Sequence, residues 1–270
     1  YRNGEDSKDI HGEDRDFRWR WGNLIGSAGW NYLINRKLFA TFTGGYTRYR
    51  SHIIQKQNAF VSSPDKNGQV YFQEGHYRSA MEDVNLRASF DYRPNVDHRI
   101  RMGSDYLFHL FRPEQSNMSS WYKDSVVSQM NNTIFSHSLI HGHEVSLYAE
   151  AEMMLTDRLR VNAGLRFTLF HVQGETYQSF QPRFSTRYLL GRNLSAKVSY
   201  TKMNQYIHLL SNSYISQPTD IWVPVTGNIR PMHAHQVTSG LFWHYKELDF
   251  SVEGYYKRMN NLVEYKDCLL

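Results

Sequence analysis

Histidine is the residue type in this chain with the most evident capacity for chemistry. His137, His141 and His143 lie within one short stretch, HSLIHGHE, and His233 and His235 lie two residues apart in MHAH. Zinc sites use several histidines. The first cluster, however, falls at the end of a long loop, where polar residues are expected anyway, and no well-placed carboxylate completes a familiar ligand set. The sequence therefore predicts no metal site and no cofactor.

Serines in the stretches GRNLS and HLLSNS are the candidates for nucleophilic catalysis. A hydrolase needs a nucleophile and a base held together. The motifs that indicate such a pair, a GxSxG elbow or an HExxH helix, do not occur in the sequence. We therefore expect that the chain is not an enzyme.

A third group of residues falls in the segment 203–235, which has no strand-like alternation and contains three prolines that restrict its backbone. Aromatic rings stack on sugars and on apolar ligands, and function concentrates in such loops. The candidates for ligand contact are Tyr206, His208, Asn212, Tyr214 and Trp222, together with Trp121 in another long segment. The alternative, of equal weight, is that Tyr214 and Trp222 pack the loop against the rim of the sheet, because long loops usually need a small core of their own.

The elements that position these residues are strands. Alternation of apolar and polar residues with period two recurs along the chain, and helical periodicity is nearly absent. In LRVNAGLRFTLFH, which begins at Leu159, the apolar residues share one face while Arg160 and Arg166 lie on the other. We expect about ten strands, at residues 17–33, 38–50, 82–92, 98–110, 144–154, 159–171, 183–190, 194–201, 236–245 and 248–257.

The connections between these strands alternate between short and long. The short ones are expected at residues 34–37, 93–98, 156–158, 191–193 and 246–247. The long ones are expected at residues 51–79, 112–143 and 203–235, with a medium one at 172–181. All the short turns then lie at one end of an antiparallel up-and-down meander. This asymmetry is typical of outer-membrane barrels, which have short periplasmic turns and long extracellular loops.

The polar faces of the expected strands carry charges of both signs, as the wall of a lumen does. Strands 144–154 and 159–171 could satisfy one another's charges across the ladder, so we interpret this wall as mainly structural. The residues expected to line the lumen are Glu150, Glu152, Arg160, Arg166, Arg183, Arg187, Lys197 and Glu253. The competing interpretation is a soluble β-rich binding module such as a carbohydrate-binding sandwich, but strands of globular proteins usually have only about five or six residues.

Composition excludes several classes of protein. The chain has no apolar run of about 18 residues, which excludes a membrane-spanning helix but not a barrel strand. Its single cysteine, Cys268, allows no internal disulfide. The net charge is +5, and basic residues are interleaved with acidic ones, so a nucleic-acid partner is not expected. Because the chain starts at Tyr1 without a signal-peptide core, we expect a processed chain or a fragment.

Residues 182–267 carry a pattern more specific than alternation. The stretches are PRFSTRYLL from Pro182, SYTKMNQYIHLLSN from Ser199, PTDIWVP from Pro218 and VEGYYKRMNNLVEYKD from Val252. In this order they resemble the barrel of a TonB-dependent outer-membrane receptor of the kind found in Bacteroidetes. Residues 1–181 fit the same architecture but contain no diagnostic motif.

The resemblance implies a 22-stranded barrel that is occluded by an N-terminal plug domain. Such receptors bind a scarce nutrient at the extracellular face and release it inward when their periplasmic partner, TonB, pulls on the plug. Their cargoes include iron–siderophore complexes, cobalamin, glycans and peptides, and a partner lipoprotein is an optional lid. In the family, charged residues of the inner wall hold the plug.

The sequence departs from a complete member of this family. No plug or TonB-contacting segment is visible, ten strands are fewer than half of those needed for closure, and the chain ends in YKDCLL without a terminal aromatic strand. An open arc would leave two bare edges. We therefore expect an all-β, incomplete segment of a large transmembrane barrel, which contacts lipid in the outer membrane and forms part of a nutrient-uptake receptor.

Overall fold

The computed structural model describes residues 10–63, 66–123, 128–136, 139–210 and 221–263, and every regular element among them is a strand. The strands are β1 (Ile10–Asn35), β2 (Leu38–Ser63), β3 (Lys66–Tyr92), β4 (His98–Lys123), β5 (Ser128–Ser136), β6 (Ile140–Thr156), β7 (Leu159–Val172), β8 (Glu175–Leu189), β9 (Leu194–Gln205), β10 (Ile207–Leu210), β11 (Ile221–Pro224), β12 (Met232–Tyr245) and β13 (Leu248–Asn260). In these ranges no helix is long and apolar enough to span a membrane.

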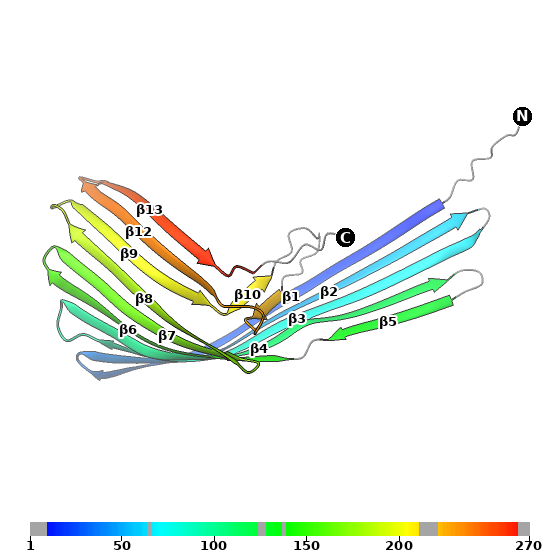
Figure 1. Cartoon of the computed structure of the whole chain (residues 1–270), viewed down its shortest axis with the longest axis horizontal. Coiled ribbons are helices and arrows are strands. Elements are labelled where there is room, and N and C mark those ends of the chain that lie inside the picture. The colour runs from blue at the N-terminus through cyan, green and yellow to red at the C-terminus, as the bar shows by residue number, and fades with distance from the viewer. Residues whose placement is uncertain (1–9, 64–65, 124–127, 137–138, 211–220, 264–270) are drawn as a thin grey trace, which may run out of the picture. The chain divides into compact units, whose positions relative to one another are not determined.

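The strands form an antiparallel up-and-down meander, as the sequence predicts. The main sheet runs in the order β1-β2-β3-β4-β6-β7-β8-β9-β12-β13, with β5 paired to β4, and β10 and β11 form a separate two-stranded sheet. Figure 1 shows β6, β7, β8, β9, β12 and β13 side by side in this order. In the described part of the chain β1, β5 and β13 each pair with a single strand, so the sheet is open.

Several strands extend far beyond the ranges expected from the sequence. Most of 51–79 is strand, as β2 and β3, and most of 112–143 is strand, as β4, β5 and β6. The backbone ladder continues there although the sequence loses its apolar alternation, because ladder hydrogen bonds are made by the main chain and do not require an apolar face. The expected connection at 172–181 is only a two-residue turn, in which Gln173 and Gly174 both have positive φ, as type I′ hairpins require.

The chain divides into two compact units. The first contains residues 1–24, 48–81 and 112–139, and the second contains residues 25–47, 82–111 and 140–270. Within the first unit, the Trp19 indole nitrogen lies 3.1 Å from the Ser51 hydroxyl, and the Lys56 ammonium lies 3.0 Å from a carboxylate oxygen of Glu74. The second unit contains the whole of β6, β7, β8, β9, β12 and β13.

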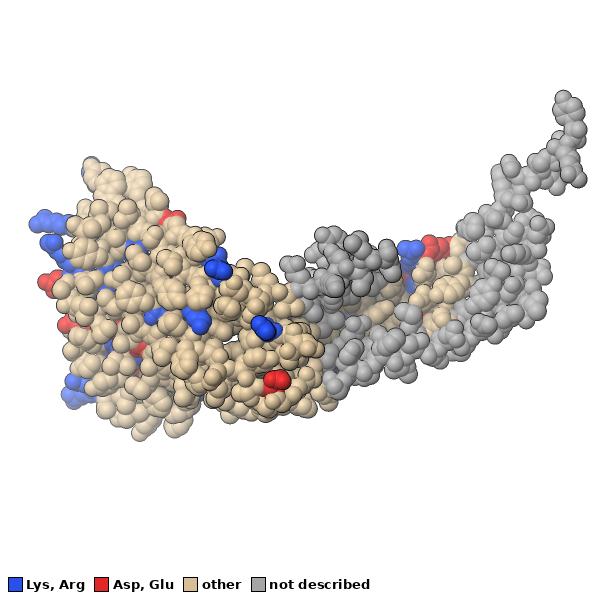
Figure 2. Space-filling model, viewed as in Figure 1, with Lys and Arg blue, Asp and Glu red and all other residues tan. Residues whose placement is uncertain are grey.

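The strands of the second unit have two chemically distinct faces. Register places Leu147, Leu165, Val198 and Leu241 on one face, which we call the apolar face, and all four are exposed. The opposite face carries most of the charged residues of the same strands, and we call it the polar face. On the surface shown in Figure 2, uncharged side chains cover most of this unit, with Lys, Arg and some acidic side chains scattered among them. A sheet that exposes its large apolar side chains in this way is built for an apolar surrounding.

Candidate functional site on the polar face

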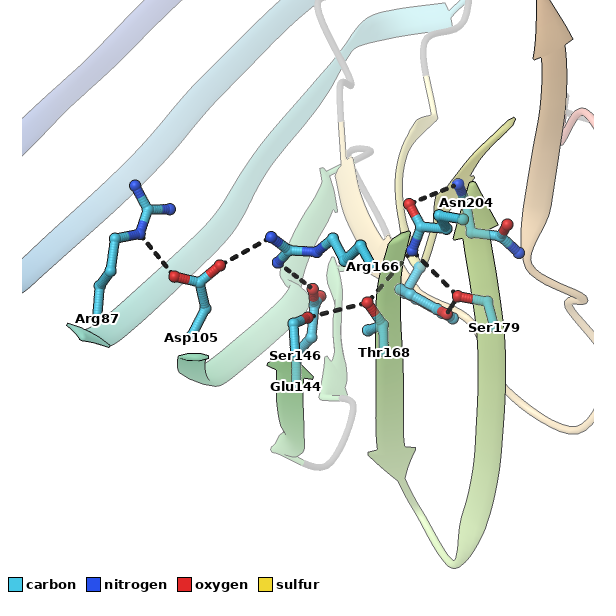
Figure 3. Close-up of polar contacts among 10 residues, drawn as sticks. Arg87, Asp105, Glu144, Ser146, Arg166, Thr168, Ser179 and Asn204 are labelled. Carbon is cyan, nitrogen blue, oxygen red and sulfur yellow. Dashed lines mark hydrogen bonds and ion pairs between the residues drawn. The ribbon is translucent and has the colours of Figure 1, made fainter. Parts of the chain in front are cut away.

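A chain of ion pairs crosses the polar face from β3 to β7 (Figure 3). Asp105, on β4, is only 2% exposed, and its carboxylate accepts hydrogen bonds from Arg87 Nε at 2.6 Å and from Arg166 Nη1 at 2.8 Å. The other terminal nitrogen of Arg166 lies 3.9 Å from a carboxylate oxygen of Glu144. A buried carboxylate is tolerated only when it is paired in this way. These ion pairs therefore fix the lateral positions of four neighbouring strands, β3, β4, β6 and β7.

Neutral hydrogen bonds continue this network towards β9. The hydroxyls of Ser146 and Thr168 lie 2.9 Å apart and are both buried, because register places the two residues directly opposite each other on β6 and β7. The Gln181 amide nitrogen donates to Thr168 at 3.2 Å and to the Ser179 hydroxyl at 3.1 Å. The Asn204 backbone N–H donates to the side-chain amide oxygen of Gln181, Oε1, at 3.4 Å. The network thus links four adjacent strands, β6, β7, β8 and β9 (Figure 3).

The chain after β9 packs back onto the polar face. We call residues 206–210 and 221–229 the folded-back segment; it includes the β10–β11 hairpin. The Tyr206 ring stacks on Phe170 with centroids 5.0 Å apart and an interplanar angle of 11°, and its hydroxyl lies 2.6 Å from that of Ser179. Stacking and a hydrogen bond together fix this side chain where it leaves the sheet.

The folded-back segment has a small hydrophobic core of its own. Phe170, Val172, Tyr206 and Val225 are buried together, and Ile140, Tyr177 and Ile229 pack at its margin. The Val225 N–H donates to the Tyr206 carbonyl at 2.8 Å, and the Tyr177 hydroxyl donates to the Thr226 carbonyl at 2.7 Å. This core lies on the face that is otherwise polar. It therefore covers one end of that face with the chain's own residues.

His208 lies inside this arrangement, opposite Val223 in the β10–β11 ladder. It is 5% exposed, and among the described residues its Nε2 atom has no hydrogen-bond partner. Burial lowers the pKa of the His208 imidazole, because the charged form would lose its hydration. The folded-back segment is therefore most stable with this imidazole neutral.

The structure places the predicted ligand-contact residues in different environments. Tyr206 and His208 are buried, and Trp222 is partly exposed and pairs with Leu209 in the hairpin. Asn212 and Tyr214 lie outside the described residues. Trp121 pairs with Met130 in the β4–β5 ladder, and its side chain also lies outside the description. A role of these residues in ligand contact stays a prediction.

The predicted lumen-lining residues lie on the polar face, as cross-strand register places them on one side of β6, β7, β8, β9 and β13. The Glu150 carboxylate lies 2.6 Å from Arg101 on β4 and 2.6 Å from the side-chain amide nitrogen of Asn162 on β7. Glu152 and Arg160 form a longer ion pair, at 3.5 Å. The charged side chains of strands 144–154 and 159–171 therefore pair with one another only in part, since Glu150 pairs with β4 instead. The residues around a hollow of about 400 Å³ near the short turns include Glu152, Arg160, Arg187, Lys197 and Glu253.

Sequence reasoning missed the most buried part of the network. Asp105 is on the polar side of the alternation in 98–110, but its two arginine partners come from strands 18 and 61 residues away in the chain. Thr168 and Gln181 give no sequence signal, since single hydroxyl and amide residues are common on polar faces. Within the described ranges no three histidine, cysteine or acidic residues are grouped as metal ligands. His137 lies outside those ranges.

Comparison with known proteins relates this architecture to one family. The family model described as "TonB dependent receptor-like, beta-barrel" matches residues 1–269. No curated protein sequence matches. The structure of the RagAB peptide transporter is similar with a TM-score of 0.55 and 11% identity, over 91% of this chain and 31% of that one. The ferric enterobactin receptor PfeA of Pseudomonas aeruginosa, a G324V mutant, is similar with a TM-score of 0.51 and 9% identity, over 92% of this chain and 44% of that one.

Proposed function

Since the chain belongs to the TonB-dependent receptor-like β-barrel family, we propose that it forms part of the wall of a receptor that imports a scarce nutrient across the outer membrane. Proteins of this family are outer-membrane proteins, so the apolar face meets lipid and the polar face meets the lumen. The chain spans less than half the length of the solved structures that it matches. Uptake, cargo and partners therefore belong to the complete receptor.

The observation that carries this proposal is the two-faced ladder of β6, β7, β8, β9, β12 and β13. One face exposes large apolar side chains on every strand, and the other carries charged and hydroxyl groups. A soluble sheet would hide the first face in a core. The soluble binding module, the competing interpretation of the sequence, leaves this exposed apolar face without a function.

The cargo that we propose is a siderophore, cobalamin, glycan or peptide, and the partners are a plug domain, TonB and, as a lid, a lipoprotein. Two of the similar structures are those of a ferric enterobactin receptor and a peptide transporter. The folded-back segment supports a ligand-contact role for Trp222, because this partly exposed side chain belongs to a segment whose small core packs on the polar face. Function concentrates on loops that are held in this way.

Uptake by cells that express the complete receptor tests this proposal. We expect outer-membrane fractionation, heat-modifiable migration on gels, and uptake of one of these nutrient classes that is abolished when TonB is deleted. Trp222→Ala should reduce ligand binding while leaving the heat-modifiable band unchanged. Recovery of the receptor in the soluble fraction, or uptake that does not depend on TonB, would contradict the proposal.

A further inference from the structure

Three basic residues lie side by side on the apolar face. In the β9–β12 ladder Lys202 is the partner of His235, and in the β12–β13 ladder His235 is the partner of Arg258. All three lie on the side that carries Val198, Val237 and Val252. We call Lys202, His235 and Arg258 the basic row. Basic residues on a lipid-facing surface require an explanation, because charge is costly in hydrocarbon.

The position of the basic row relative to the apolar band explains how it is tolerated. The row below it, towards the short turns, is Tyr200, Val237 and Tyr256, and the row above it is Asn204, His233 and Asn260. From Leu248, next to a short turn, to Arg258 the strand rises about 33 Å, which becomes about 25 Å across the membrane at the usual barrel tilt. This equals the height of a barrel's apolar band. The basic row therefore lies at the level of lipid headgroups, on the side opposite the short turns.

Among the described residues, no neighbour neutralises the charges of the basic row. In the part of the chain that the structure describes, neither Lys202 nor Arg258 takes part in an ion pair, and no acidic residue occupies the apolar face of β9, β12 or β13. The polar face differs, since there Glu150 meets Arg101 and Asp105 meets two arginines. Because no described acidic residue lies beside Lys202 and Arg258 on this face, the positive charge of the basic row can attract an anion from outside the protein.

His235 is oriented by its neighbours. Its Nδ1 atom lies 2.9 Å from the Tyr200 hydroxyl, and its ring meets that of His233 edge-on, with centroids 5.9 Å apart and an angle of 89°. When Tyr200 donates to Nδ1, the neutral imidazole carries its proton on Nε2 and can donate it to an acceptor outside the sheet. The imidazole then places an oriented donor between two cations.

We propose that the basic row binds the phosphate groups of an anionic lipid in the outer leaflet. Adjacent strands are about 4.8 Å apart, so the three side chains span about 10 Å and can engage a headgroup that bears one or two phosphates. Lysine and arginine make charge-assisted hydrogen bonds to phosphate, and the tyrosine row below meets the start of the acyl chains. The inference depends on the barrel lying in the membrane and is independent of the nutrient that the receptor imports.

The test is lipid binding by the complete receptor in mild detergent, measured by native mass spectrometry during titration with diphosphoryl lipid A. Each basic residue near an anionic lipid surface contributes a factor of about five, so Lys202→Gln with Arg258→Gln should weaken binding about thirtyfold. Lys246→Gln with Lys257→Gln removes the same charge from a turn and from the polar face and should have little effect. Lys202→Arg with Arg258→Lys should bind as the wild type does, which shows that the positions tolerate substitution.

Three results would overturn the proposal. These are an unchanged affinity in the Lys202→Gln, Arg258→Gln receptor, an equal loss in the Lys246→Gln, Lys257→Gln receptor, and displacement of the lipid by millimolar inorganic phosphate. The last result would identify a site for free phosphate instead of a lipid site. Heat-modifiable migration of every variant establishes that the barrel has folded. Uptake assays run in parallel keep a failure of this proposal distinct from a failure of the uptake proposal.

Discussion

The two ends of the polar face are built differently. Near the folded-back segment, Asp105, Ser146, Thr168 and Phe170 are almost fully buried and satisfied by the chain itself. Near the short turns, Arg187, Lys197 and Glu253 remain exposed around an open hollow. There the Lys197 ammonium lies over the Phe242 ring, 3.9 Å from its centroid. The end near the folded-back segment, the covered end, is closed by the chain's own residues, whereas the end near the short turns, the open end, is exposed.

This difference separates two roles for polar residues on one wall. A network whose central members, Asp105, Ser146 and Thr168, are buried and paired stabilises the arrangement of the strands, because removing one of their partners leaves a buried polar group unsatisfied. Exposed charges contribute little to stability but keep their capacity to bind. We therefore infer that the polar residues of the covered end mainly stabilise the fold. We infer that those of the open end contact the plug domain of the complete receptor.

The largest effect is expected from Phe170→Ala. The Phe170 ring is fully buried and supports Tyr206, so its loss should leave a cavity and lower the free energy of unfolding by about 3–5 kcal/mol. Urea unfolding of the refolded barrel, followed on gels by loss of heat-modifiable migration, measures this change. Phe242→Ala at the open end is the control and should cost much less. Equal costs would remove the distinction between the two ends.

Asp105→Asn should have the next largest effect. The substitution preserves shape but removes the negative charge that Arg87 and Arg166 share, and charge-assisted hydrogen bonds of this kind contribute about 1.5–3 kcal/mol. Because Arg87 is well exposed to solvent, we expect a loss of about 2 kcal/mol in the same urea assay. A change within experimental error would show that the buried ion pairs do not hold β3, β4 and β7 together.

A pH effect is expected at the folded-back segment. The pKa of His208 is lower in the folded state, so the unfolded state binds the proton more readily and stability falls as the pH drops below about 6.5. Hydrogen exchange of residues 206–210 and 221–229, compared at pH 7.5 and 5.5 after correction for intrinsic rates, should reveal local opening at the lower pH. His208→Gln should abolish this dependence, whereas His244→Gln at an exposed turn should leave it intact. Persistence of the pH dependence in His208→Gln would assign it to another group.

The smallest effect on stability is expected from Arg187→Gln with Glu253→Gln at the open end. Both side chains are exposed, so the free energy of unfolding should change by less than about 0.5 kcal/mol. Binding of the separately purified plug domain, measured by isothermal titration, should weaken nevertheless. If stability falls and plug binding does not change, the open end is structural and the proposed division of roles is wrong.

The strands could be predicted from the sequence wherever one face meets lipid, because that face must be apolar on alternate residues. Leu159, Val161 and Leu165 give this signal directly, and the order of the meander followed from it. The extended hairpins in 51–79 and 112–143 have no such constraint, and the sequence there contains no period that distinguishes strand from loop.

The covered end of the polar face could be predicted only in part. The length of 203–235 indicated that this segment needs a core of its own, with Tyr214 and Trp222 as the packing residues, whereas the aromatic residue that the structure places in such a core is Tyr206. The partners of Asp105 and the stacking of Tyr206 on Phe170 depend on register between strands that are distant in the chain. Local patterns contain no information about such pairs, since a one-residue shift in register would exchange every partner.

The central claim is that one face of this sheet meets lipid and the other meets the lumen. It is tested most directly by attaching a fluorophore to single cysteines in the complete receptor, with Cys268 replaced by serine, and reconstituting it with lipids brominated on their acyl chains. Labels at Val198 and Val237 should be strongly quenched, while labels at the adjacent Ser199 and Thr238 should not. Equal quenching at neighbouring positions would contradict the account.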